Sequence, residues 1–136
     1  MVKIEGVYQG QKHCEISHVN SGATLQTDAP KDNNGLGQSF SPTDLVGVAL
    51  GSCMMTVMAI WAEQNNVSLQ GSRFSVVKEM KANPRRVGRL TVQFVLPAKL
   101  EQNVRTRLEE IARTCPVKYS IHPEIELPIE FSYSLD

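Results

Sequence analysis

The chain has 136 residues, 41% hydrophobic and 21% charged, which is typical of one globular domain. Its 14 basic residues balance 14 acidic ones, so net charge favours neither nucleic acid nor an anionic membrane as a partner. The N-terminus lacks the apolar core of a secretion signal, and we expect no membrane span. Three cysteines without such a signal indicate a reducing compartment, so we expect a cytoplasmic protein.

Three short alternating segments open the chain. Residues 2–10, 12–20 and 23–27 alternate apolar with polar side chains and are separated by turn residues, which predicts an antiparallel meander of three strands. Residues 28–41 are polar and rich in glycine, so we expect a loop there. Loops of this length in compact domains are often functional.

A long apolar helix is predicted next, from Pro42 to about Asn65. Ser41 can cap it, Pro42 suits its first position, and Asp44 brings a negative charge to the positive end of its dipole. The apolar side chains surround the axis instead of forming one stripe, which predicts a helix buried on nearly all sides. A chain of this size covers such a helix poorly, so we expect a second subunit to contribute.

The second half of the chain predicts a hairpin, a helix and a final strand. Residues 69–82 and 87–96 alternate and are joined by a proline-containing turn, as in a β-hairpin. Residues 97–114 have apolar positions at helical spacing, and residues 124–133 alternate as a strand. This order of elements predicts an α+β fold, and we expect residues 1–136 to form one domain.

Two cysteines lie in settings that can support redox chemistry. Cys53 lies deep inside the apolar helix, whereas Cys115 directly precedes Pro116 at a predicted helix start. The helix start favours the thiolate of Cys115 and suits it to a leaving or resolving role. Cys53 lies too far past Pro42 for the helix dipole to activate it, so it needs a cation or donor from elsewhere. The alternative for both residues is inert packing, since free cysteine is commonly buried.

Four segments around these cysteines carry a resemblance to a known family. They are Ser41-Pro42-Thr43-Asp44-Leu45, Ala49-Leu50-Gly51-Ser52-Cys53, Pro84-Arg85-Arg86-Val87 and Cys115-Pro116-Val117-Lys118. In this order, over about residues 30–125, they resemble the OsmC/Ohr family of thiol-dependent peroxidases. The resemblance implies an OsmC-like α+β fold, with antiparallel sheets around a long buried central helix, in an intertwined homodimer. It also implies reduction of organic hydroperoxides, with Cys53 as the peroxidatic thiol and Cys115 as the resolving thiol.

These roles agree with cysteine chemistry. A thiolate attacks the O–O bond and becomes a sulfenic acid, which a second thiol converts to a disulfide before further oxidation occurs. The expected partners are therefore a small organic hydroperoxide, a dithiol reductant and a second copy of the chain. We expect no cofactor, metal, nucleic acid or membrane partner.

The chain departs from the family's pattern in two places. Those peroxidases pair the reactive thiol with an N-terminal arginine and with a glutamate ten residues before the cysteine. Thr43 occupies the glutamate position here, and no arginine precedes Arg73. Asp44 lies about half a turn around the helix from Cys53, so we interpret it as a cap. The basic residues that can replace the missing cation are Lys12, His13 and Lys31, or Arg85 and Arg86 from the hairpin of the other subunit.

Two other functions stay open at this stage. An OsmC-like homodimer without peroxidase activity can bind a small apolar or thiol-containing ligand at the subunit interface, and a structural protein can simply bury its cysteines. Cys14 lies in a predicted strand, where we expect a structural role. His18 and His122 lack a metal-binding spacing relative to the cysteines, so we expect no metal site.

Overall fold

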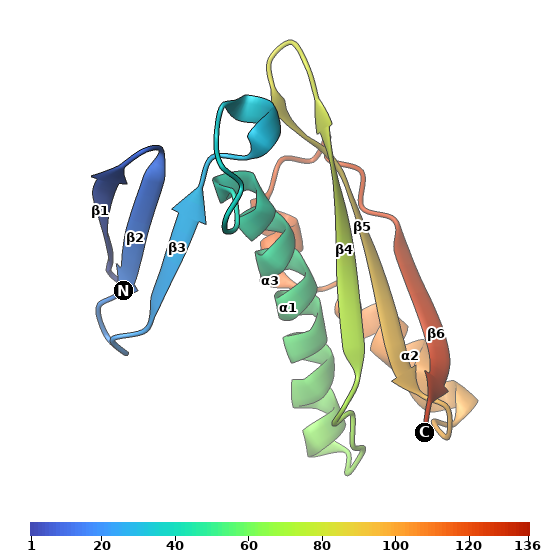
Figure 1. Ribbon diagram of the computed structural model, residues 1–136. Helices are drawn as coiled ribbons and strands as arrows, with labels where there is room; N and C mark the ends of the chain where they lie inside the picture. The colour runs from blue at the N-terminus through green and yellow to red at the C-terminus, as the bar shows by residue number, and fades with distance from the viewer. The chain divides into compact units, whose positions relative to one another are not determined.

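The computed structural model describes residues 1–136, which form two compact units, residues 1–46 and residues 47–136. Figure 1 shows their elements in chain order. These are β1 (Ile4–Gly10), β2 (His13–His18), β3 (Thr24–Asp28), the 3-10 turn η1 (Lys31–Asn33), α1 (Pro42–Gln64), β4 (Arg73–Lys81), β5 (Arg86–Pro97), α2 (Gln102–Ala112), α3 (Pro116–Ser120) and β6 (Ile129–Leu135). The predicted α+β class is confirmed.

The first unit contains the predicted meander. Its three strands pair antiparallel in the order β1-β2-β3, with Cys14 opposite Tyr8 on one side and Thr27 on the other. Gln11 and Lys12 form the tight turn between β1 and β2, and both have positive φ, at 53° and 62°. Two successive residues with positive φ are typical of hairpin turns that match the twist of paired strands.

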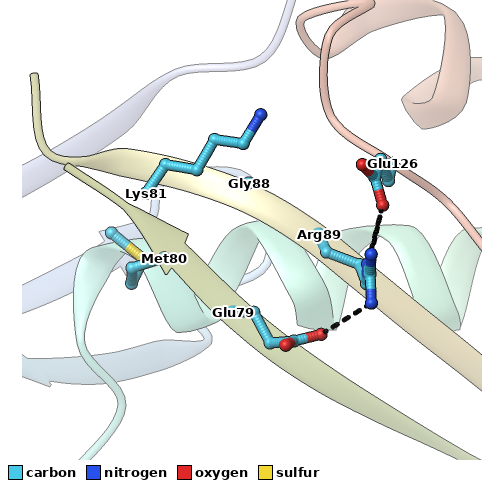
Figure 2. A pocket seen from close by; sticks show the side chains of 6 residues that line it. All are labelled: Glu79, Met80, Lys81, Gly88, Arg89 and Glu126. Carbon is cyan, nitrogen blue, oxygen red and sulfur yellow. Dashed lines mark hydrogen bonds and ion pairs between the residues drawn. The ribbon is translucent and has the colours of Figure 1, made fainter. Parts of the chain in front are cut away.

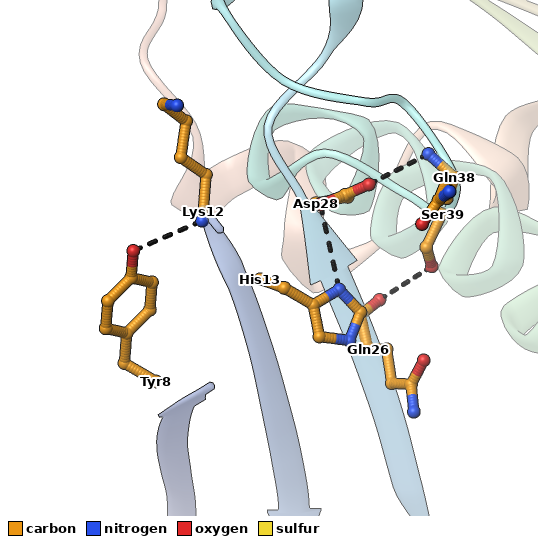
Figure 3. A network of polar contacts seen from close by, with 7 residues as sticks. All are labelled: Tyr8, Lys12, His13, Gln26, Asp28, Gln38 and Ser39. Atoms are coloured by element: carbon orange, nitrogen blue, oxygen red, sulfur yellow. Dashed lines mark hydrogen bonds and ion pairs between the residues drawn. The ribbon is translucent and has the colours of Figure 1, made fainter. Parts of the chain in front are cut away.

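The long loop after β3 is held by polar contacts with the first sheet, as Figure 3 shows. Asp28, only 2% exposed, accepts a hydrogen bond from the backbone N–H of Gln38 at 2.9 Å. Its other carboxylate oxygen lies 3.7 Å from Nδ1 of His13. The Ser39 hydroxyl donates to the carbonyl of Gln26 at 2.9 Å. A buried carboxylate requires such partners, and here they anchor the end of the loop.

The start of α1 has the reciprocal cap that its sequence predicts. The N–H of Asp44 donates to Oγ of Ser41 at 3.1 Å, while the N–H of Ser41 donates to the Asp44 carboxylate at 2.8 Å. Two backbone donors at the helix start are thus satisfied by side chains. The interpretation of Asp44 as a cap is confirmed.

We expect Ser41→Ala to lower the free energy of unfolding by about 1 kcal/mol, because the N–H of Asp44 loses its acceptor. Urea denaturation followed by circular dichroism measures this change. Ser134→Ala is the matched control, since Ser134 is exposed on β6, and it should alter stability by less than about 0.5 kcal/mol. Equal stabilities of the two variants would contradict the role of the cap.

The sheet of the second unit is mixed. It has the order β4-β5-β6, in which β4 pairs antiparallel with β5 and β6 pairs parallel with β5. The expectation of wholly antiparallel sheets is therefore wrong for β6. The reason is the long connection through α2 and α3, which returns the chain to the same end of the sheet before β6 begins.

One face of this sheet forms the core of the second unit. Along β5, Leu90, Val92, Phe94 and Leu96 are at most 1% exposed, while the intervening Gln93 is exposed. The part of α1 that lies in this unit packs on this face through Gly47, Leu50, Gly51, Met54, Met58 and Ala62. A Cβ atom at Gly51 would lie 2.7 Å from the Phe74 ring, so glycine is required for this close approach.

Helix α2 covers β6 on the same face. The guanidinium of Arg105 lies 4.3 Å from the ring centre of Tyr133, and that of Arg113 lies 5.7 Å from the ring centre of Phe131. The Tyr133 hydroxyl donates to Glu109 at 2.6 Å. Burial, followed by this hydrogen bond, raises the pKa of Tyr133, so its hydroxyl remains a donor. These contacts fix the end of α2, from which the chain enters the segment containing Cys115.

The opposite side of α1 is not covered within its unit. Val48 and Ile60 are 42% and 52% exposed, so the single chain buries one face of the helix and leaves another open. By length and composition α1 is apolar enough to cross a membrane, but core helices of globular proteins share these properties. Contribution of a second subunit to this helix stays a prediction.

Candidate active site

The two cysteines singled out in the sequence come together inside the second unit. Cys53 lies in the middle of α1 and is half-buried. Cys115 follows the end of α2, is the N-cap residue of α3, and is 0% exposed. The two thiols lie close enough for Cys53 to raise the pKa of Cys115, although 61 residues separate them in the chain. Packing of α1 and α2 on one face of the sheet therefore creates a dithiol.

Cys115 keeps its proton in this arrangement. Burial raises the pKa of the Cys115 thiol, and the neighbouring Cys53 raises it further, against the opposing effect of nearby backbone N–H groups. The expectation that the helix start favours a Cys115 thiolate is thus wrong. Desolvation of a fully buried sulfur outweighs the N–H donors of a short helix. Cys115 is instead suited to donate its S–H to the sulfur of Cys53.

The local sequence holds the Cys115 sulfur in place. The backbone N–H of Lys118 donates to Sγ at 3.3 Å, and that of Val117 also contacts the sulfur. Pro116 begins α3, and the Lys118 ammonium donates to the Arg113 carbonyl at 3.3 Å. Lys118 thus ties the start of α3 to the end of α2. The predicted position of Cys115 at a helix start is confirmed.

The guanidinium groups of two arginines in the second unit are already bonded to nearby acceptors. Arg86 donates to the carbonyl oxygens of Ala82 and Pro84 at 3.0 and 2.9 Å. Arg89 lies 2.6 Å from Glu126 and 3.7 Å from Glu79, and Figure 2 shows it between these carboxylates beside a cavity of 170 Å³. The hydrogen bond to Glu126 raises the pKa of Arg89. The role of Arg86 in activating Cys53 stays a prediction.

The two histidines considered as metal ligands have local partners. His18 contacts the Ser21 hydroxyl at 2.6 Å, and Nδ1 of His122 accepts from the Glu124 N–H at 3.1 Å. Cys14 is half-buried in β2 and is unbridged. The structure contains no group of three His, Cys, Asp or Glu side chains that could hold a metal ion.

A further cavity lies at the C-terminal half of α1, and sequence reasoning did not anticipate it. Its volume is 430 Å³, and its lining combines apolar side chains such as Met55 and Leu69 with polar ones such as Gln70 and Ser72. The Ser72 hydroxyl is buried without a hydrogen-bond partner. The hydrophobic period of the helix does not predict this cavity, because the segment after the helix supplies much of its lining.

Comparison with known proteins establishes the family. The model of the OsmC-like protein family matches residues 35–130, which include both cysteines of the dithiol. This chain belongs to the OsmC-like family. The predicted resemblance and OsmC-like fold are therefore confirmed. None of the curated proteins matches the chain.

Solved structures of the family have the same fold. A candidate osmotic stress induced and detoxification response protein from Psychrobacter arcticus 273-4 is 36% identical, with a TM-score of 0.93, and the match covers 97% of this chain and 96% of that one. The organic hydroperoxide resistance protein OsmC from Legionella pneumophila is 18% identical, with a TM-score of 0.73 and coverage of 97% and 96%. A candidate organic hydroperoxide resistance protein from Vibrio cholerae, with captopril in one of its active sites, is 16% identical, with a TM-score of 0.75 and coverage of 96% and 90%.

Proposed function

We propose that this protein reduces organic hydroperoxides with Cys53 as the peroxidatic thiol and Cys115 as the resolving thiol. The observation that carries the proposal is the contact between two thiols of unequal burial, one half-buried and one fully buried. A reactive thiol must meet its substrate, whereas a resolving thiol must meet only the first sulfur. The names of the structural relatives support a role in stress defence.

The reaction proceeds in two steps at the dithiol. The Cys53 thiolate attacks the terminal oxygen of the hydroperoxide; the O–O bond breaks, the alkoxide takes up a proton and leaves as an alcohol, and Cys53 becomes a sulfenic acid. The Cys115 sulfur then attacks the Cys53 sulfur, the S–O bond breaks, and water leaves as the disulfide forms. A dithiol in a reducing cytoplasm restores both thiols.

The S–H of Cys115 supports the first step. The family's glutamate position is Thr43 in this chain, and no arginine occurs before Arg73. Burial keeps the Cys115 thiol protonated beside Cys53, so its S–H is the donor that this chain offers to the Cys53 sulfur.

Thiol titration tests the proposal. A Cys14→Ser protein has only the two thiols of the dithiol, and one equivalent of an alkyl hydroperoxide should remove both of them and yield one equivalent of alcohol. Peptide mapping should then find Cys53 linked to Cys115. Persistence of both thiols in excess hydroperoxide would refute the proposal.

We also propose that the protein is a homodimer that pairs through the open face of α1, defined as Val48, Ser52, Thr56, Ala59 and Ile60. The hydroxyls of Ser52 and Thr56 donate to carbonyls one turn earlier, at 2.6 and 2.7 Å. The polar hydrogens of this face are therefore already bonded within the helix. A mainly apolar helix face with small residues suits close packing against a second copy.

Ile60→Glu should weaken self-association at least about ten-fold, because a buried interface would receive an unpaired charge. Sedimentation equilibrium measures the association constant. Asn103→Glu, on the exposed side of α2, is the matched control and should leave association unchanged. A native protein that remains monomeric at micromolar concentrations would contradict the homodimer.

A second candidate function is the binding of a small apolar ligand without peroxidase chemistry. The cavity of 430 Å³ with its unpartnered Ser72 hydroxyl favours it, since such cavities accept small molecules that bring one polar group. If this function is the principal one, Leu69→Trp should abolish ligand binding, and Cys53→Ser should leave it unchanged. Isothermal titration with a medium-chain alcohol is the direct measurement.

A further inference from the structure

We propose that the reductant of this protein attacks the sulfur of Cys53, and that Cys115 is the thiolate that leaves. This inference rests on the proposed function, because it concerns the disulfide formed in that cycle. A disulfide has two sulfurs, and attack at either one restores one thiol. The surroundings of Cys53 and Cys115 differ enough to select one of them.

The exposure of the two cysteines favours attack by the reductant at the sulfur of Cys53. Thiol–disulfide exchange requires the incoming sulfur to approach the target along the S–S axis, from the side opposite the leaving sulfur. Cys115 is 0% exposed, and α3 begins directly after it, so an approach to its sulfur is closed by the protein. Cys53 is half-buried and retains exposed surface on α1. Of the two cysteines, only Cys53 has exposed surface in the folded chain.

The Cys115 sulfur, which leaves in this exchange, has backbone N–H donors beside it. The N–H of Lys118 already donates to the Cys115 sulfur at 3.3 Å, and the N–H of Val117 contacts the same atom. These donors offset part of the desolvation that raises the pKa of the Cys115 thiol, and the leaving sulfur takes up a proton as the S–S bond breaks. Departure from Cys53 has no equivalent, because Cys53 lies mid-helix, where backbone N–H groups are bonded within the helix.

The dithiol reductant reduces the protein disulfide in two exchange steps. One thiolate of the dithiol bonds to the Cys53 sulfur, and the S–S bond breaks so that Cys115 leaves with the electron pair and gains a proton. The second thiolate of the reductant then attacks its own first sulfur, which releases the Cys53 thiolate and a cyclic disulfide. The dithiol is oxidised by two electrons, and the protein disulfide is reduced by two.

Mapping of the mixed disulfide tests the inference. The Cys14→Ser protein is oxidised with diamide, which forms the disulfide without a hydroperoxide, and is then treated briefly with 2-mercaptoethanol and quenched with iodoacetamide. Mass spectrometry after trypsin separates the peptide containing Cys53 from the one ending at Lys118. We expect the mercaptoethanol adduct on Cys53 and the carbamidomethyl group on Cys115, with at least about ten-fold excess over the reverse.

Single-thiol variants give a second measurement. In the Cys14→Ser background, Cys115→Ser leaves only Cys53, and Cys53→Ser leaves only Cys115. The former should react with an aromatic disulfide reagent at least about ten times faster than the latter, as their exposure predicts. An adduct mainly on Cys115, or equal reaction rates, would overturn the inference. Because diamide forms the disulfide, this experiment does not require peroxidase activity. A protein inactive toward hydroperoxides would therefore refute the proposed function but would leave the choice between the two sulfurs testable.

Discussion

Cys53→Ser is expected to lower the steady-state rate of alkyl hydroperoxide reduction by at least about 100-fold. A serine hydroxyl is not ionised near neutral pH and is a weak nucleophile toward an O–O bond, whereas a thiolate attacks it readily. The fold should survive, because the change replaces one sulfur by oxygen at a half-buried position of α1. Coupled oxidation of a dithiol, followed by absorbance, measures the rate.

Two further variants make this result specific. Cys14→Ser is the matched control in β2, and it should retain the native rate within about two-fold. In the absence of a dithiol, Cys115→Ser treated with one equivalent of hydroperoxide should yield alcohol and leave Cys53 as a sulfenic acid, because no resolving thiol is present. A Cys53→Ser protein with the native rate would exclude the proposed mechanism.

Phe94→Ala is expected to lower the free energy of unfolding by about 3–5 kcal/mol. Phe94 is 1% exposed at the centre of the second sheet, and its ring stacks on Phe131 with centroids 5.3 Å apart. Phe74 lies on its other side, at 6.4 Å. Removal of the ring leaves a cavity between three strands, and the loss is a large share of a typical stability of about 5–15 kcal/mol.

Urea denaturation at a fixed protein concentration measures this loss, since self-association would add to the apparent stability. Phe40→Ala is the matched control, because it removes the same ring from a side chain that is 52% exposed. We expect it to cost less than about 1 kcal/mol. If the two variants unfold at the same urea concentration, Phe94 is not the centre of the core.

The sequence predicted most elements because their signals are local. The cap formed by Ser41 and Asp44, the alternation in β5 and the helix start after Cys115 depend on residues a few positions apart. The flanks of Cys53 and Cys115 also carried the family resemblance, which the match over residues 35–130 confirms. Such patterns fix which residues form each element.

The tertiary structure decided what depends on residues far apart in the chain. The parallel pairing of β6 with β5 follows from the path through α2 and α3, which no alternation pattern encodes. The contact of Cys53 with Cys115 requires α1 and α2 to share one face of the sheet. Burial, which raises the pKa of Cys115, is likewise a property of the packed chain, because desolvation depends on all surrounding atoms.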